Sequence, residues 1–486
     1  MTTSEPSTAN GIGSRPAHEH ILFPRASIHH HAGLLARFLT DLRYEDIPRD
    51  ALHMAKLVTL DTIGCIVAGT DTSLGKKVLK AYGSESLGHG CCVPGTSLEV
   101  FPSTAAKVNA WLSDVLDYED VAVGHPSATV IPAALAMAEH LNATPRQFLT
   151  GVVAGYEAGL RVHDATRASP DAYRRFAVYH AWHGLAAGAA AMVVSQGSEE
   201  QVRSALGHAA ANTNLPLWYV QYGRPAHALK ANYGQMALGG VDAALCARQD
   251  IIGPFAMLSD PERGFAKIIG SDQFDPSQLS AGLAQVWRIQ STALKAYPCC
   301  AALHTTIDAI AKIVRAQGID HKSVEGIRIR CFSRVSEWFS DTSPLSELDA
   351  QFSVQYASAM ALLSIEPGRE WYSRSQMEDA AVSDVMKRVQ IEVDPVAEKA
   401  FWHQTKYMSS VQLSMRDGKI FNETVEWAPG HFERPFSDSD VEKKFLHNLK
   451  GTQLEGRGEN IVEATMNMDR ATSLVELQKL LRTPRT

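Results

Sequence analysis

The stretch from Ser113 to Pro132, SDVLDYEDVAVGHPSATVIP, places acidic residues and a histidine close together in the chain. The acidic residues are Asp114, Asp117, Glu119 and Asp120. His125 follows them, between a glycine and a proline, just before an apolar run. Carboxylates and an imidazole on a short connection between helices can move protons in a catalytic site. An exposed acidic loop with a capping histidine accounts for the same residues, so both interpretations stay open.

His183 lies at the predicted N-terminus of an alanine-rich helix, after the sequence YHAW. The positive end of a helix lowers the pKa of an imidazole and attracts anions. This position favours a neutral base, although a helix-capping histidine is an equally good explanation.

The segment from Gln221 to Lys230, QYGRPAHALK, contains three potential cations, Arg224, His227 and Lys230. Arginine can hold a carboxylate through a two-pronged contact, and lysine binds one as a point charge. The alternative to an anion-binding segment is a solvated basic turn.

Lys295 belongs to the largely apolar sequence LKAYPCC, and His304 follows shortly after it. Partial burial would either lower the pKa of this lysine or leave it charged against a carboxylate. Tyr356 opens a later apolar helix, where its hydroxyl could act as an acid or donor. Core packing is the more common role of a tyrosine at such a position.

The composition of the 486-residue chain argues against several classes of protein. A formal net charge of −7 is not the basic field of a general nucleic-acid-binding protein, so we expect no nucleic-acid partner. The seven cysteines form no CxxC pair, which predicts neither a disulfide framework nor a zinc site. HExxH, P-loop and GxGxxG motifs are also missing, and we expect no metal and no other cofactor.

Residues 1–31 are rich in Ser, Thr, Ala, Pro and His and lack an apolar signal core, which predicts a disordered tail. No apolar run reaches the length of a membrane span, and we expect no membrane partner. The cysteine usage indicates a reducing compartment. We therefore predict a cytoplasmic protein and leave a mitochondrial location open.

Apolar periodicity predicts a helical region followed by a smaller mixed one. Helices are predicted over Gly33–Leu42, Ala51–Gly69, Ser103–Leu116, Ala128–Leu141, Pro145–Val162, His183–Gln196 and Glu199–Ala211. After about Trp287, strands are predicted over Val324–Cys331, Val389–Val393, Ser409–Met415 and Ile420–Trp427. The last two flank an Asp-Gly turn, a strong hairpin signal. The final residues, from Ser437, are again helical in pattern.

Five ordered motifs resemble those of the MmgE/PrpD family. They read DIPRDALHMAKLVTLDTIGCIVAG from Asp46, LDYED with HPS and IPA from Leu116, YHAWHG from Tyr179, LKAYPCCAALHTTIDAI from Leu294 and AQFSVQYASAMALL from Ala350. The resemblance covers the chain from about Ala32 to its end. It implies a mainly α fold, with an all-helical domain (residues 32–287 and 431–486) and an inserted α+β lid domain (288–430). It also implies a homodimer, no cofactor and an active site between the two domains.

Carried across motif by motif, the resemblance implies a set of catalytic residues. They are Asp117, His125, His183, Lys295 and Tyr356. Arg224, His227, Lys230 and His304 are the expected substrate-binding residues. Arg224 stands where family members usually have lysine, and Val121 and Gln351 also depart from common family residues. These departures lie at the expected substrate contacts.

The family's small polycarboxylate substrates imply a lyase. We expect His125 to be the main proton carrier, oriented by Asp117, with His183 and Tyr356 as complementary acid or base. Lys295 and Arg224 would clamp carboxylates. Dehydration of 2-methylcitrate or a longer alkylcitrate is the leading expectation, and decarboxylation of cis-aconitate to itaconate is the alternative. An epimerase or a non-catalytic metabolite-binding protein are further alternatives, because the residue set alone does not separate these reactions.

Overall fold

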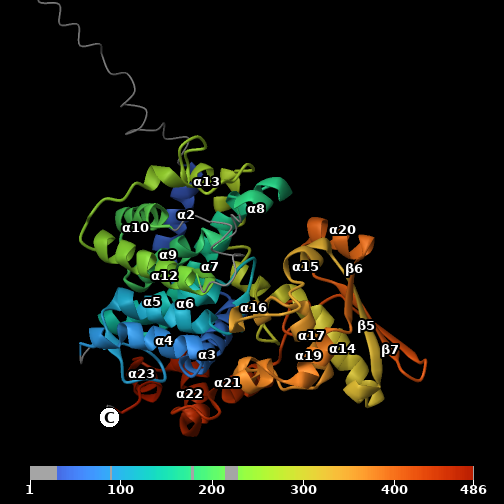
Figure 1. Cartoon of the computed structure of the whole chain (residues 1–486). Helices are drawn as coiled ribbons and strands as arrows, with labels where there is room; N and C mark the ends of the chain where they lie inside the picture. Colours follow the sequence, from blue (N-terminus) through green and yellow to red (C-terminus); the bar gives the residue numbers. More distant parts are fainter. Residues whose placement is uncertain (1–29, 88–89, 177–179, 214–227, 485–486) are drawn as a thin grey trace, which may run out of the picture.

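The computed structural model describes residues 30–87, 90–176, 180–213 and 228–484 of the chain. These residues form a mainly α-helical protein with a few small sheets, as predicted (Figure 1). The tail predicted at the N-terminus lies almost entirely outside the described residues, and so do Arg224 and His227.

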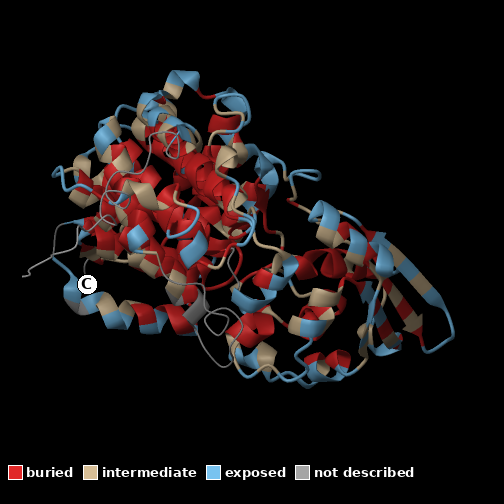
Figure 2. Cartoon of the chain, turned by 90° about the horizontal axis from the view of Figure 1, so that it is seen from above, coloured by how far each residue is buried: buried red, intermediate tan, exposed pale blue. Residues whose placement is uncertain are grey.

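The centre of the helical part is a set of closely packed helices. They are α3 (Arg49–Thr70), α5 (Pro102–Asp114), α6 (Pro126–Leu141), α7 (Pro145–Ala165), α9 (His183–Val194) and α12 (Ala228–Ala247). Small residues let them approach closely. A Cβ at Gly240 of α12 would lie 2.6 Å from the Cβ of Ala187 on α9, so only glycine fits at this crossing. Figure 2 shows the resulting buried interior.

Around this centre lie α2 (His30–Asp41), α4 (Ser73–Tyr82), α8 (Pro170–Phe176) and α10 (Glu199–Ala211). The predicted helices are confirmed with shifts of a few residues at their ends. Helix α12 was missed, because the polar stretch before it resembled a turn.

Helix α3 is apolar nearly all round. By length and composition it could cross a membrane, so the expectation that no apolar run reaches this length is wrong. In the structure, 83% of its most apolar window is buried inside the protein. Its side chains form part of the helical core.

The last helices of the chain return to the helical core. They are α21 (Asp438–Leu449), α22 (Gly458–Met466) and α23 (Val475–Leu481), and Figure 1 shows them beside α3 and α4. Val441, Phe445 and Leu449 of α21 are buried in the same core as α3. A Cβ at Gly64 of α3 would lie 2.9 Å from the ring of Phe445, which shows how closely the two helices pack.

A second buried core surrounds a four-stranded sheet in the order β6-β5-β7-β8. The strands are β5 (Val324–Cys331), β6 (Val389–Val393), β7 (Ser409–Met415) and β8 (Ile420–Val425). β5 pairs in parallel with β6 and antiparallel with β7, and β7 and β8 form the predicted hairpin. Gly418 in its turn has a φ of +85°, as an Asp-Gly turn requires.

Helices α14 (His304–Gln317), α17 (Val354–Leu362) and α19 (Ala380–Met386) pack beside this sheet (Figure 1). Leu116 and Tyr118, which follow α5, are buried in the same second core. The acidic stretch therefore lies where the two cores meet. The predicted domain boundaries and the role of the second domain as a lid stay predictions.

Candidate active site

The acidic loop, residues 115–119, connects α5 to the short strand β3 (Asp120–Val121). β3 pairs antiparallel with β4 (Ala293–Leu294), which places Lys295 beside the acidic loop although the two are far apart in sequence. The loop turns through Asp117, whose φ of +53° is unusual for a residue other than glycine.

His125 is held at the start of α6, where it is the residue before the helix. Asp120 supports this helix start, because its Oδ1 accepts a hydrogen bond from the backbone N–H of Ser127 at 3.0 Å. Its Oδ2 accepts another from the hydroxyl of Tyr156. Burial raises the pKa of Asp120 to about 6. Proline at the first helical position suits such a start, so the HPS motif orients the imidazole.

Asp117 forms ion pairs with two buried lysines. The Nζ of Lys230 lies 3.0 Å from its Oδ1, and the Nζ of Lys295 lies 3.1 Å from its Oδ2. Lys295 also donates to the backbone carbonyl of Asp117 at 2.9 Å, and Lys230 lies 3.2 Å from Oδ2 of Asp114. Because Lys230 is fully buried in α12, its interpretation as part of a solvated turn is wrong.

These contacts set the charges in the cluster. Burial opposes ionisation of Asp117, but Lys230 and Lys295 outweigh it and hold its pKa well below the ordinary value. Burial likewise opposes the charge of the two lysines, but the carboxylates outweigh it and raise their pKa values. Burial and the neighbouring Glu119 raise the pKa of Asp114 well above its usual range. Asp114 is therefore harder to ionise than Asp117 in the same cluster.

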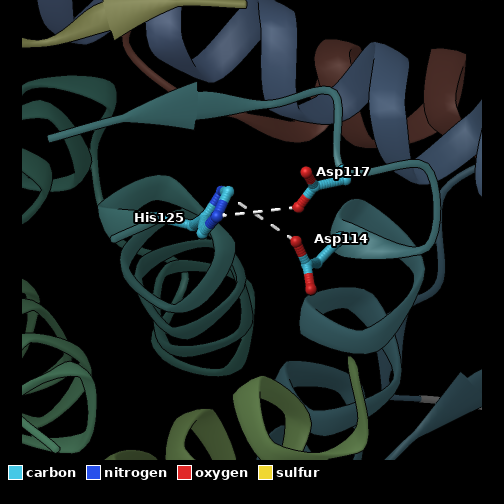
Figure 3. Close-up of side chains that lie close together, drawn as sticks. All are labelled: Asp114, Asp117 and His125. Atoms are coloured by element: carbon cyan, nitrogen blue, oxygen red, sulfur yellow. Dashed lines mark ion pairs between the residues drawn. The ribbon is translucent and has the colours of Figure 1, made fainter. Parts of the chain in front are cut away.

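His125 faces this carboxylate group (Figure 3). Its Nδ1 lies 2.9 Å from Oε1 of Glu119, and its Nε2 lies 3.6 Å from Oδ1 of Asp117. The side chain is 13% exposed and lines a cavity. Burial, together with the positive charge of Lys295, lowers its pKa to about 4. The imidazole is therefore a neutral base near pH 7, in contact with carboxylates that stabilise its protonated form.

Ligand atoms of Asp114, Asp117 and His125 lie within 4.8 Å of one another, close enough to share a metal ion (Figure 3). The ammonium groups of Lys230 and Lys295 already contact these carboxylates. A metal ion would have to compete with two cations fixed by the chain, so the donor set fits a metal poorly.

His183 contacts His125 through the backbone. Its Nδ1 donates to the carbonyl of His180 at 2.7 Å, and its Nε2 accepts from the N–H of His125 at 3.1 Å. The ring is fully buried, and burial lowers its pKa to about 3. A Cβ at Gly124 would lie 2.7 Å from this ring, and Gly124 has a φ of +113°. In this arrangement both ring nitrogens are occupied, and His183 positions His125.

His180 and Tyr233 form a second polar pair near the cluster. The hydroxyl of Tyr233 lies 2.7 Å from Nδ1 of His180, and its ring packs edge-on against His125. His180 lines the same cavity as His125, and burial lowers its pKa well below the ordinary value.

The cavity beside His125 has a volume of about 390 Å³. Its lining includes the polar residues Asp117, His125 and His180 and a group of aromatic side chains, which we call the aromatic wall. The aromatic wall consists of Tyr173, Phe352, Phe401, Trp402 and Tyr407, with Arg334 among them. A second cavity of about 260 Å³ is lined by Lys295 and His304 and shares Val121 and Tyr407 with the first. The two cavities therefore adjoin, with Asp117 and His125 lining the first and Lys295 lining the second.

The remaining predicted residues lie farther from the cluster or outside the described residues. His304 is buried, and its Nε2 lies 3.2 Å from the carbonyl of Cys299. Tyr356 lies in the second core and donates its hydroxyl hydrogen bond to the carbonyl of Trp371. The structure thus brings together Asp117, His125, Lys230 and Lys295, with His183 behind them, and does not bring Tyr356 to them. The catalytic role of each residue stays a prediction.

Four residues of the site are missing from the catalytic and binding residues predicted above. Asp114 and Glu119 were named in the acidic stretch next to His125, but they were given no role of their own. His180 precedes His183 by three residues, which places it near the same helix start. Tyr233 carried no sequence signal, because only the fold brings it to His180.

Comparison with known proteins identifies the family. The chain matches the MmgE/PrpD N-terminal domain over residues 33–277 and the MmgE/PrpD C-terminal domain over residues 297–469. It therefore belongs to the MmgE/PrpD family. The resemblance of the five motifs is confirmed.

Similar proteins carry a consistent name. A cis-aconitate decarboxylase of Aspergillus terreus (strain NIH 2624 / FGSC A1156) is 25% identical over 93% of this chain and 95% of its own length. The human cis-aconitate decarboxylase is 24% identical over 89% of this chain and 90% of its own length. The cis-aconitate decarboxylase-like protein oryM of Aspergillus oryzae (strain ATCC 42149 / RIB 40) is 22% identical over 92% of this chain and 96% of its own length.

Proposed function

We propose that the protein is a lyase that decarboxylates cis-aconitate or a closely similar unsaturated polycarboxylate. The observation that carries this proposal is the position of the His125 imidazole, which lines a cavity and lies 2.9 Å from the carboxylate of Glu119. Next to it lies the carboxylate of Asp117, which the buried ammonium groups of Lys230 and Lys295 hold in its ionised form. The names of the similar proteins support the choice of reaction.

The reaction needs a proton donor and a site for developing negative charge. As the bond to the departing carboxylate breaks, carbon dioxide leaves and the electron pair stays on the substrate carbon, delocalised into its conjugated system. The His125 imidazolium then gives its proton to carbon, and the neutral imidazole regains a proton from water. Binding of a polyanion beside His125 would raise its pKa from the low value of the free protein, because nearby negative charge favours the imidazolium. Lys295 would help to stabilise the negative charge that develops.

Proton NMR of the purified protein with cis-aconitate in deuterated buffer tests this proposal. The expected result is itaconate that carries deuterium at the protonated carbon, together with release of carbon dioxide. Return of unchanged cis-aconitate after long incubation at high enzyme concentration would contradict the proposed decarboxylation.

Dehydration of 2-methylcitrate or an alkylcitrate is the second candidate. The aromatic wall of the cavity, which includes Phe401 and Trp402, supports it, because such a wall would accommodate an alkyl substituent. In that reaction His125 would remove the proton next to a carboxylate, and the imidazolium that forms would give this proton to the hydroxyl group, which leaves as water. Incubation with 2-methylcitrate in the same NMR assay should then give a methylaconitate. Deuterium exchange without either product would favour an epimerase, and binding without any chemical change would favour a metabolite-binding protein.

The homodimer, the absence of a cofactor and the cytoplasmic location are part of the same proposal. Light scattering of the full chain should give twice the monomer mass of 52.9 kDa. Turnover after dialysis against a chelator should be unchanged, because the two lysines supply the positive charge at Asp117.

A further inference from the structure

Three backbone carbonyl groups of the acidic loop each accept a hydrogen bond from a buried side chain of a different segment. The amide of Gln351 donates to the carbonyl of Val115 at 2.7 Å. Lys295 donates to that of Asp117 at 2.9 Å, and Lys444 to that of Tyr118 at 2.6 Å. The loop that carries Asp117 is therefore held by side chains from three separate segments of the chain.

Lys444 comes from α21, more than 300 positions after the loop, and it is 8% exposed. Its Nζ lies 2.7 Å from Oδ1 of Asp61 on α3 and 4.1 Å from the centre of the Tyr118 ring. The hydroxyl of Tyr118 in turn donates to the carbonyl of Ala296 at 3.4 Å, next to Lys295. Lys444, paired with Asp61, thus contacts both the backbone carbonyl and the ring of Tyr118, the residue after Asp117.

A buried ion pair is weak evidence for stability, because removing two charges from water costs about as much as their attraction returns. Such a pair needs another explanation. Asp117 has a positive φ, which is costly for an aspartate and persists only where the surroundings impose it. Lys444 supplies a charged hydrogen-bond donor to the adjacent peptide group.

We propose that Lys444, paired with Asp61, is a positioning residue that holds the acidic loop so that Asp117 meets Lys230, Lys295 and His125. It acts through the loop and does not contact the substrate cavity. This inference rests on the proposed proton-transfer role of the cluster. It gives α21 a positioning role besides the packing of Val441, Phe445 and Leu449 in the helical core.

Two variants separate positioning from stability. Lys444→Met removes the donor and leaves Asp61 buried and unpaired, so it should lower the melting temperature. The double variant Asp61→Asn/Lys444→Met removes both charges and should recover most of that loss, while the carbonyl of Tyr118 still lacks its donor. Lys443→Met, at the exposed neighbour on the same helix, is the matched control.

Hydrogen exchange of the peptide that contains residues 115–119 is the first measurement, and it needs no substrate. In both Lys444 variants we expect this loop to exchange at least about 10-fold faster than in the wild type, because a charged hydrogen bond is lost. With cis-aconitate, kcat should fall at least about 10-fold while KM changes less than about twofold, because a small misplacement affects the reacting geometry more than binding. Lys443→Met should match the wild type in both measurements.

Wild-type loop exchange and wild-type kcat in the double variant would overturn the proposal, since the pair would then serve stability alone. If the wild type turns over neither cis-aconitate nor 2-methylcitrate, the proposed function fails. The exchange of the loop still decides whether Lys444 positions it.

Discussion

The two walls of the 390 Å³ cavity differ in the kind of side chain that they present. The wall formed by the acidic loop and the start of α6 carries Asp117 and His125, backed by Lys230 and Lys295. The aromatic wall includes Phe401 and Trp402 from α20 (Pro395–Gln404).

This difference suggests that the charged wall transfers protons and that the aromatic wall selects the substrate. Groups that move protons need fixed partners, and the charged wall provides them through ion pairs and hydrogen bonds from four separate segments. Aromatic side chains give shape and apolar surface, which select a substrate without taking part in proton transfer. Changes in the charged wall should therefore lower kcat, and changes in the aromatic wall should alter KM and preference.

Lys295→Met should have the largest effect among the variants of residues that support or face His125. It removes the ammonium group from Oδ2 and the backbone carbonyl of Asp117, so kcat should fall about 10²- to 10³-fold. Breaking a buried pair also costs about 3–5 kcal/mol of stability, which thermal unfolding would show. Lys419→Met, at a side chain that is 70% exposed, is the control. A normal kcat in Lys295→Met would show that the charge of Lys295 is not needed for the reaction, and would contradict the role proposed for the charged wall.

The pKa of His125 can be measured in the free protein, and it tests whether the charged wall is buried. Burial and Lys295 lower this pKa from 6.5 to about 4, so the imidazole should stay neutral as the pH falls to 5 and gain its proton only near pH 4. NMR titration of ¹⁵N-labelled histidines can measure this, with the resonance assigned by its loss in His125→Gln. Titration near pH 6.5 would mean that the ring is solvated and not part of the buried cluster. In Lys295→Met the pKa should rise, because a repelling positive charge is gone.

Trp402→Ala tests the aromatic wall. The indole N–H donates to Glu398 at 2.8 Å, away from the charged cluster, and the ring lines the cavity. We expect KM to rise about 10-fold with kcat changed less than about threefold, measured by steady-state kinetics. His403→Ala, at the exposed neighbouring residue, is the control. A large loss of kcat with an unchanged KM would break the proposed division.

Tyr356→Phe should have the smallest effect. Its hydroxyl donates to the carbonyl of Trp371 inside the second core, so the loss should cost about 0.5–1.5 kcal/mol of stability. We expect kcat to change less than about threefold. A 100-fold fall in kcat, with the fold intact by circular dichroism, would instead establish the catalytic role that the family resemblance implies.

Local signals in the sequence predicted much of the fold. The Asp-Gly turn placed the β7–β8 hairpin, and apolar periodicity placed α3, α7 and α10 within a few residues. Non-local contacts were harder to predict. Lys230 is buried only because Asp114 and Asp117 come to it from a distant segment, so its polar surroundings in the sequence suggested a surface turn.

The same limit applies to the candidate site. The motifs located Asp117, His125 and Lys295, which the structure brings together. They did not reveal that both ring nitrogens of His183 bond to the backbone, since that depends on the geometry of Gly124 and His180. Nor did they reveal Lys444, whose contact with Tyr118 requires the last helices to pack against α3.

Turnover of cis-aconitate by His125→Gln, beside the wild type, tests the central claim most directly. Glutamine keeps much of the size of histidine and its ability to form hydrogen bonds, but it cannot carry the proton. We expect a loss of about 10²- to 10⁴-fold in kcat with an unchanged circular dichroism spectrum. A variant that produces itaconate at close to the wild-type rate would contradict it, and would show that the proton passes through another group.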